Sequence, residues 1–492
     1  MRTDCHWLVQ PNPCDFPSLF KHFMNKLLSF PVTFRTTLVL FALFLLPLTG
    51  PVRAQSPLPE PTRQELLSGL KILFWQKSGD PNVLLKMRIQ SGAAYDLAGK
   101  AGMMALLGDV LFPEAETRQY FTDELGGRLE VATDYDGLTI SMSGRSSGFE
   151  RMIELLRNAL MSTPLSPEIV TRLREARIQM LRDTNATPSS VADRAIAARL
   201  FGEFPYGRPA SGAAETVARV DRGDLMQARE RFLNADNATL VIVGGLDDRR
   251  TMRTLRQLLG NWRKSDRVVP PTFRQPEPPD ARTLIVHRPG IQDAEIRLAT
   301  RGLARADKDY LAANVLAAVA RDRWQVALAD ISKAPVFVRH EAHTVPGMFV
   351  LGTSVKNPNA AKALAAAQSV IRSLTATPPT ATELEKARSE LSSELTRQLS
   401  EPASLIELWL DAETFKLGSV NQLASGLRIL TASDVQAVAG RLFKEKPVAA
   451  VILGNYDELK SGFGNLEKFE VLGDPSITPA TNKAGPPPTK KP

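Results

Sequence analysis

Histidine and cysteine, the side chains that most often hold a metal ion or act as nucleophiles, are scarce in this sequence. The chain of 492 residues has five histidines and two cysteines, Cys5 and Cys14. Residues 55–280 contain neither a histidine nor a cysteine. A zinc hydrolase site made of carboxylates alone would be highly unusual, so we expect no such site in this stretch.

Three histidines lie in the second half of the chain. His340 and His343 are three residues apart in Val336–Val345, where apolar and polar residues alternate as in a strand. Because residues three apart on a strand point to opposite faces, these two histidines cannot easily reach one metal ion. We therefore interpret them as part of a solvated strand face, and His287 as an ordinary residue at a strand end.

Residues 1–54 have the pattern of a secretory signal peptide. An unbroken apolar run, Leu38–Leu46, follows basic residues and precedes Val52-Arg-Ala54, which offers small residues at a cleavage site. The run is shorter than the roughly 20 residues that a membrane-spanning helix needs. Such a signal would begin more naturally at Met24. We expect export across the inner membrane to the periplasm, with no transmembrane span in the mature chain.

The balance of charge and hydrophobicity narrows the function classes. Without residues 1–54 the chain would keep 56 basic and 51 acidic residues and no cysteine. The basic residues are interspersed with acids, so binding to nucleic acid is not predicted. A chain without cysteine can form no disulfide, which suits an oxidising compartment. With 43% hydrophobic and 23% charged residues, the composition excludes a disordered or multi-span membrane protein.

Proline-rich segments divide the remaining sequence. Val268–Asp280 has five prolines in thirteen residues, which predicts an extended linker over 266–282. This linker separates an N-terminal domain, 63–265, from a C-terminal domain, 283–473. The last segment, 474–492, is rich in proline, threonine and lysine and predicts a disordered tail.

The two predicted domains repeat the same order of elements. Each has an alternating strand, a long helix that begins after a proline-containing turn, and a closing helix followed by an apolar strand. The pairs are strands Val83–Ile89 and Ala294–Thr300, helices Ile169–Leu181 with N-cap Ser166 and Leu384–Leu399 with N-cap Thr382, helices from Asp224 and Asp434, and strands Ala238–Gly244 and Val448–Gly454. This repeat predicts an α+β fold of two tandem homologous domains, each a mostly antiparallel sheet with helices packed on one face.

This layout resembles the pitrilysin/insulinase family of zinc peptidases, whose halves are tandem α+β domains. The similarity runs from about Gly69 to about Leu472, and Pro205-Tyr-Gly-Arg-Pro209 after a helix is fairly specific. The other segments that carry it are Ser91–Asp96, Gly102–Phe112, Leu125–Gly127, Ala238–Gly244 and the duplicate strand ending at Gly454.

Active members of that family carry an inverted zinc motif, HxxEH, on the helix that here follows Gly102. Its two histidines bind zinc, and its glutamate is the general base toward the metal-bound water. The corresponding residues of this chain are Ala105, Gly108 and Asp109. A methyl group cannot ligate zinc, a glycine cannot abstract a proton, and one carboxylate does not make a site. The resemblance therefore implies a member that has lost the zinc motif.

Two further features of the family have weak counterparts. A later ligand glutamate corresponds to Arg177 or Ile178, or to Glu175 if the match is shifted by two residues. An arginine and a tyrosine of the second half, which position the substrate and stabilise the oxyanion, correspond to Arg323 and to Val336 or Phe337.

Phe337 keeps an aromatic ring but lacks the phenol donor. Arg323 and Phe337 are therefore candidate substrate contacts. Otherwise Arg321 and Arg323 are interpreted as solvated arginines at a helix end.

The resemblance implies a catalytically inactive subunit of the cell envelope. This subunit would pair with a zinc-bearing homologous peptidase and form with it a chamber that processes peptides. The alternative is a stand-alone peptide-binding or scaffold protein of the periplasm, and an active zinc metalloendopeptidase is the least supported function. We predict no catalytic residue, metal ligand or cofactor in this chain, and zinc only in the partner.

Overall fold

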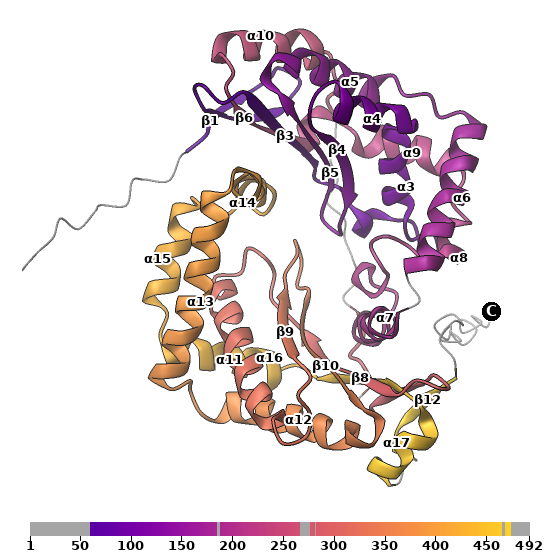
Figure 1. Cartoon of the computed structure of the whole chain (residues 1–492), viewed down its shortest axis with the longest axis vertical. Coiled ribbons are helices and arrows are strands. Elements are labelled where there is room, and N and C mark those ends of the chain that lie inside the picture. The colour runs from indigo at the N-terminus through magenta and orange to yellow at the C-terminus, as the bar shows by residue number, and fades with distance from the viewer. Residues whose placement is uncertain (1–59, 185–186, 266–275, 281, 465–467, 474–492) are drawn as a thin grey trace, which may run out of the picture. The chain divides into compact units, whose positions relative to one another are not determined.

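The computed structural model of the chain describes residues 60–184, 187–265, 276–280, 282–464 and 468–473 (Figure 1). The predicted signal region 1–54, most of the predicted linker and the predicted tail 474–492 lie outside the described residues. The described strands form two six-stranded sheets.

The first sheet has the strand order β1-β2-β6-β3-β5-β4. Neighbouring strands are antiparallel except β2 and β6, which are parallel. The strands are β1 Thr62–Glu65, β2 Lys71–Gln76, β3 Asn82–Ile89, β4 Arg128–Thr133, β5 Leu138–Arg145 and β6 Ala238–Gly244. The α-helices between and after them are α3 Met103–Leu111, α4 Ala115–Asp123, α5 Phe149–Met161, α6 Pro167–Thr184, α7 Pro188–Phe201, α8 Ala214–Val217, α9 Arg222–Phe232 and α10 Asp248–Leu259.

The second sheet has the strand order β12-β7-β11-β8-β10-β9, with β7 parallel to β11 and to β12. Its strands are β7 Leu284–His287, β8 Asp293–Arg301, β9 Val336–Glu341, β10 Met348–Lys356, β11 Ala449–Gly454 and β12 Glu470–Leu472. The helices of this half are α11 Tyr310–Leu328, α12 Ala360–Ala376, α13 Ala381–Ser400, α14 Pro402–Thr414, α15 Asn421–Ile429, α16 Ala432–Phe443 and α17 Tyr456–Phe463.

The two sheets repeat one topology, which confirms the predicted fold class. From β2 and β7 onward each strand order is the same, with a parallel pair followed by three antiparallel pairs. Only the outermost strands differ. β1 comes from the start of the first half and is antiparallel to its neighbour, whereas β12 comes from the end of the second half and is parallel.

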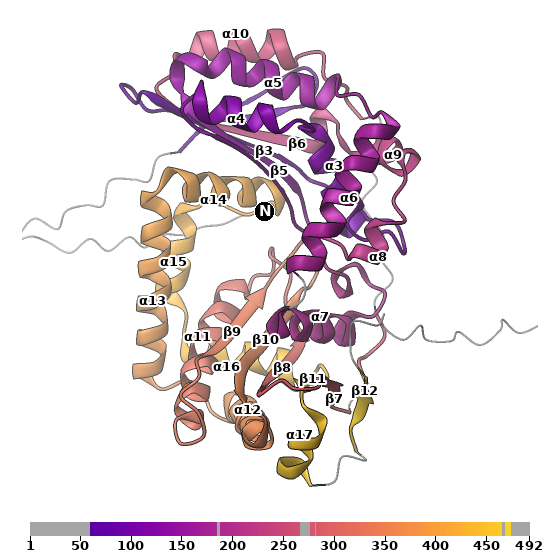
Figure 2. The ribbon, with the colours of Figure 1, turned by 45° about the vertical axis from the view of Figure 1, so that its right-hand side comes forward.

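Helices cover both faces of each sheet, so the prediction of helices on one face was incomplete. In β6, Leu240 and Ile242 enter the main core of the first half, while Val241 and Val243 pack against Leu405 and Trp409 of α14. The burial of every residue of β6 follows, because a strand covered on both faces has no solvated side. Figures 1 and 2 show α14 on the face of the first sheet opposite α5.

The second sheet is covered in the corresponding way by a helix of the first half. Ile285 of β7 belongs to the core under α11, α12 and α16, whereas Leu284 and Val286 pack against α7. Figure 2 shows α7 lying along β8. Each half therefore contributes one helix to the other half's sheet, α14 in one direction and α7 in the other.

Some predicted boundaries need correction. The side chain of Ser166 accepts a hydrogen bond from the Ile169 amide at the start of α6, as expected of an N-cap. For α13 the N-cap is Thr380 and not Thr382, because Thr380 and Glu383 form a reciprocal capping box. The closing strand β11 begins at Ala449, one residue later than predicted.

Candidate functional site

The helix that would carry a zinc motif is α3, and its N-terminus is fixed by a buried carboxylate. Asp96 accepts hydrogen bonds from the backbone amides of Gly102, at 2.6 Å, and Met104, at 2.8 Å. Burial raises the pKa of Asp96 to about 6 in spite of these hydrogen bonds. Gly102 has φ 92°, and a Cβ there would lie 2.7 Å from Val217, so the turn into α3 requires glycine.

The positions of the lost motif lie on the face of α3 between the sheet and α6. Ala105 is 5% exposed. Gly108 packs against the sheet, where an added Cβ would lie 3.1 Å from Val131 of β4 and 3.5 Å from Leu138 of β5. A side chain at this position would be tight against Val131, whose side chain would have to give by a few tenths of an ångström.

Asp109, the third motif position, is held by a guanidinium. Arg177 of α6 places Nε 2.6 Å from Oδ2 and Nη2 2.8 Å from Oδ1 of Asp109. The same Nη2 donates to the carbonyl of Ala105 at 3.1 Å, and Nη1 to the carbonyl of Ser211 at 3.4 Å. This two-point contact is the strong geometry of an arginine–carboxylate pair.

The residues present at α3 do not fit a zinc ion. The one carboxylate already binds a permanent cation, and the two other positions have no donor atom. In the described part of the chain, no three His, Cys, Asp or Glu side chains gather closely enough to hold a metal ion.

Of the three positions considered for the later ligand, only Arg177 contacts Asp109. Ile178 packs against the core of the first half, and Glu175 is exposed.

Arg323, a candidate substrate contact, lies inside α11 and is paired. Its Nε is 2.7 Å and its Nη2 2.9 Å from the carboxylate of Glu383, and Arg323 holds the pKa of that carboxyl down to about 2. Arg321 makes a similar pair with Glu390. The interpretation of the two as solvated arginines at a helix end was wrong, because α11 continues to Leu328 and both find carboxylates.

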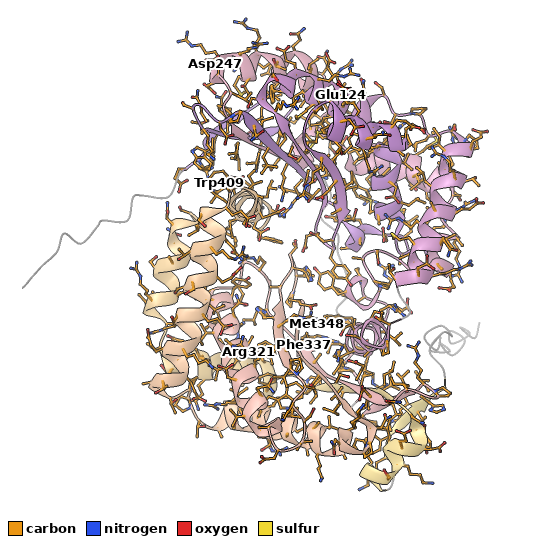
Figure 3. The ribbon with its side chains drawn as sticks, in the orientation of Figure 1. Glu124, Asp247, Arg321, Phe337, Met348 and Trp409 are labelled. Carbon is orange, nitrogen blue, oxygen red and sulfur yellow. The ribbon has the colours of Figure 1, made fainter. Side chains whose placement is uncertain are left out.

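Phe337, the other candidate, lies on β9, where Figure 3 labels it, and two guanidinium groups lie over its ring. Arg297 and Arg339 lie 4.9 Å and 4.4 Å from its ring centroid. Its ring also packs against Gly352 of β10, where an added Cβ would lie 2.1 Å from it, and against the apolar cluster under α7. Phe337 and Arg323 thus contact different partners.

The histidines form separate contacts, and neither His340 nor His343 is part of a solvated face. Nε2 of His340 accepts a hydrogen bond from the Leu303 amide at 3.0 Å. His343 lies beyond the end of β9 at Glu341, so strand alternation does not apply to it. His287 ends β7, as predicted, and accepts from the Tyr456 amide.

Sequence reasoning missed a polar and aromatic cluster that joins the two halves. Nδ1 of His343 lies 2.8 Å from Oδ2 of Asp136, and the Thr344 amide donates to Oδ1 at 2.9 Å. Burial alone would raise the pKa of Asp136, but these hydrogen bonds bring it below its ordinary value. The rings of Tyr135 and Tyr206 lie 5.1 Å and 4.8 Å from the His343 ring. The Pro205-Tyr-Gly-Arg-Pro209 motif, which supplies Tyr206, was the one available signal.

Comparisons with known proteins agree with this fold. The family description "Peptidase M16 inactive domain" matches residues 219–391. The chain is 21% identical over 279 residues to cytochrome b-c1 complex subunit 1 of Bos taurus. This match covers 54% of this chain and 56% of the relative. It is 18% identical over 209 residues to an uncharacterized zinc protease of Rickettsia bellii, covering 41% of this chain and 50% of the relative. The chain thus spans about half the length of these two curated relatives.

Solved structures show the same fold. A protease from Helicobacter pylori has a TM-score of 0.74 at 18% identity, covering 81% of this chain and all of that one. The first half of the periplasmic protease PqqL from Escherichia coli has a TM-score of 0.67 at 14% identity, covering 82% of this chain and 94% of that one. Together with the duplicated topology and the altered α3, these matches support a relationship to the pitrilysin/insulinase-type (M16) peptidase family, among its non-catalytic members.

Proposed function

We propose that this chain is the inactive subunit of a two-chain peptidase of the cell envelope. Its partner is a homologous chain that bears an intact zinc motif, and the two enclose a chamber in which peptides are processed. The chain supplies half of the wall of that chamber, and the partner supplies the metal and the general base.

The observation that carries this proposal is the pair between Arg177 and Asp109. A member that had merely lost its zinc would leave an unsatisfied carboxylate on α3, whereas here the helix is fixed to α6 by a charged and hydrogen-bonded contact. The family fold is thus kept while the site for chemistry is closed. Such a structure suits a protein whose role is assembly and binding.

The names of related proteins support pairing and location. The bovine relative is named as a subunit of a larger complex, and the Escherichia coli neighbour is described as periplasmic. The apolar run Leu38–Leu46 and its flanking residues, which have the pattern of a signal peptide, also favour a periplasmic location. No helix in the described part of the chain has the length and apolar character needed to cross a membrane.

Reconstitution tests the pairing. The mature chain is mixed with a zinc-bearing homologue encoded beside it, and the mixture is followed by size-exclusion chromatography and by cleavage of a quenched fluorescent peptide library. We expect a stable complex whose peptidase activity exceeds that of the homologue alone. In a control, the general-base glutamate of the homologue is replaced by glutamine, which should abolish activity but keep the complex. Chains that elute separately, with no gain in activity, would refute the subunit function.

A stand-alone peptide-binding or scaffold protein of the periplasm is the second candidate. It is favoured by Phe337, which lacks a phenol donor and lies beneath the guanidinium groups of Arg297 and Arg339. Without a phenol donor, this residue cannot stabilise the oxyanion that forms during peptide cleavage in a partner's active site. In the same experiment, this candidate requires peptide binding by the isolated chain, measured by fluorescence anisotropy.

A further inference from the structure

The outer side of α10 carries a row of arginines beside a pocket. Arg249, Arg253 and Arg256 are spaced i, i+4 and i+7, which places them on one face of the helix, and all three are exposed. Together with Gln64 of β1, Asp248 and Met252 they line a pocket of about 360 Å³. This volume is within the range of small-ligand sites. Figure 1 shows α10 beside α5, on the helical side of the first sheet.

These three arginines have no carboxylate partner among the ion pairs of the described residues, although the same helix contains a paired one. Arg250, on the adjoining face of α10, has Nη2 3.2 Å from the carboxylate of Glu150. Asp248 is the one carboxylate among the lining residues, so the three arginines leave the pocket with an excess of positive charge. Three arginines that line one pocket attract an anion and can offer it many donors.

An independent observation concerns Asp248, which lines the same pocket. Its Oδ1 atom is buried and has no hydrogen-bond partner. It is not required for capping, because Asp247 accepts from the Arg250 amide at the start of α10; Figure 3 labels Asp247 at this helix end. A buried acceptor without a donor is unfavourable, and a small rotation of the Asp248 side chain toward the pocket would let a hydroxyl or amine group there satisfy it.

We propose that this pocket binds a small phosphate ester that carries a hydroxyl or amine group. The arginines bind the phosphate, and Asp248 accepts a hydrogen bond from the hydroxyl or amine. A phosphate suits the site better than a single carboxylate does, since its oxygens can accept from several guanidinium groups at once. The same chemistry is present in a soluble ester such as glycerol 3-phosphate and in the headgroup of phosphatidylglycerol. This site lies on the helical layer of the first half and does not depend on the proposed pairing.

Calorimetric titration of the full chain with glycerol 3-phosphate tests the soluble source. We expect saturable binding that weakens at least about 10-fold in Arg253→Gln and about 100-fold or more in the triple variant Arg249→Gln, Arg253→Gln, Arg256→Gln. Arg250→Gln is the matched control and should change affinity less than about 2-fold. Asp248→Asn should remove the preference for glycerol 3-phosphate over inorganic phosphate, while leaving inorganic phosphate binding within about 2-fold. Circular dichroism and melting temperature establish that each variant is folded.

Co-sedimentation with vesicles tests the lipid source. Binding to vesicles that contain phosphatidylglycerol, absent for phosphatidylcholine alone and lost in the triple variant, would assign the site to a lipid headgroup. Binding of the soluble ester alone would assign it to a free metabolite, and either result supports the proposal. It is overturned if neither ligand binds, if Arg250→Gln weakens binding as much as Arg253→Gln, or if an acidic peptide of equal charge binds more tightly than the ester.

Discussion

At the scale of single residues, Arg177 binds Asp109, the third of the residues that the sequence places at the zinc-motif positions. Arg177 and Asp109 come from α6 and α3, and the side chains are 12% and 30% exposed. Because both are partly shielded from water, their attraction is stronger than that of a surface pair. The pair therefore connects α3 with α6, the helices to which the sequence resemblance assigns the zinc motif and the later ligand.

Arg177→Met should destabilise the fold by about 1–3 kcal/mol, since it leaves a partly buried carboxylate without its donors. Urea unfolding followed by circular dichroism measures the change. Arg172→Met is the matched control: Arg172 is also on α6 and pairs with Glu114, but both side chains are more than half exposed, and we expect no measurable change. Equal effects of the two substitutions would contradict a special role for the Asp109 pair.

The same residues predict the metal content of the protein. Ala105, Gly108 and the occupied Asp109 give zinc no ligand set, so purified chain dialysed against buffer should contain far less than one zinc per chain by elemental analysis. The result should not change after incubation with excess zinc and desalting. One tightly held equivalent would contradict our interpretation of α3.

His340 gives the chain a stability that depends on pH. Burial lowers the pKa of His340 to about 4, whereas an unfolded histidine titrates near 6.5. The groups that face it include the Leu303 amide, Arg305, Asp307 and Lys446. The native state therefore holds neutral His340, and its contribution is complete above pH 6.5 and is lost as the pH falls toward 4.

We expect this contribution to amount to about 3 kcal/mol between pH 7 and pH 4. His340→Gln keeps an acceptor for the Leu303 amide but does not titrate, so its stability should fall less over this range. The comparison with the parent protein is essential because Asp96, with its pKa raised to about 6, favours the folded state at acid pH and opposes the trend. Parallel unfolding free energies from pH 4 to pH 7 would contradict the assignment.

At the scale of elements, the start of α13 shows the limit of reading a cap from residue type. Thr380 and Thr382 both stand directly before residues that can form the first turn of a helix, and threonine is a favourable N-cap residue at either position. The structure selects Thr380, whose hydroxyl accepts from the Glu383 amide at 3.2 Å while the Glu383 carboxylate accepts from the Thr380 amide at 2.8 Å. Glu383 also binds Arg323, so a contact from α11 fixes which residue caps the helix.

Thr380→Ala should lower the unfolding free energy by about 1 kcal/mol, the usual effect of losing an N-cap. Thr382→Ala changes an exposed position in the first turn of α13 and should have little effect. Thermal unfolding of the two variants beside the parent separates the alternatives. A larger loss in Thr382→Ala would restore the cap predicted from the sequence.

At the scale of the whole molecule, each half completes the burial of the other. Trp409 of α14 packs on the first sheet and Ile196 of α7 on the second, and they are 2% and 0% exposed. Charged contacts accompany the apolar ones: Arg88 of β3 binds Glu407 and Asp411 of α14, and Arg297 of β8 binds Asp193 of α7. Neither sheet is covered on both faces by its own half.

Hydrogen exchange should show this dependence directly. Ile196→Ala should reduce protection in β8 and β11, and Trp409→Ala in β2 and β6, with losses in stability of about 2–5 kcal/mol. Ile429→Ala on α15 is the control, because Ile429 is 77% exposed. If each substitution reduced protection equally in both sheets, the effect would be global unfolding and not the loss of a local cover.

Local patterns in the sequence were sufficient for many elements and for the loss of the zinc motif. β6 has the predicted bounds, and the alternation of Val83–Ile89 lies in a strand that begins at Asn82, because side-chain periodicity acts over a few residues. β1 and β2 were not predicted. β1 has only four residues, and β2 buries three consecutive residues, Ile72 to Phe74, so it lacks the alternation that marks a strand in the sequence. The failure at His343 has a related cause: alternation continued in the sequence after the strand itself had ended.

The sequence by itself determined the duplicated order of elements, and it predicts Ala105, Gly108 and Asp109 at the positions of the zinc motif, because periodicity, capping and residue identity are local properties. Only the tertiary structure decided that Arg177 binds Asp109 across 68 residues, that His343 meets Asp136 across 207, and that α7 and α14 each cover the other half's sheet. Such contacts depend on how whole elements pack, and no short window of sequence specifies which distant charges or apolar faces will meet.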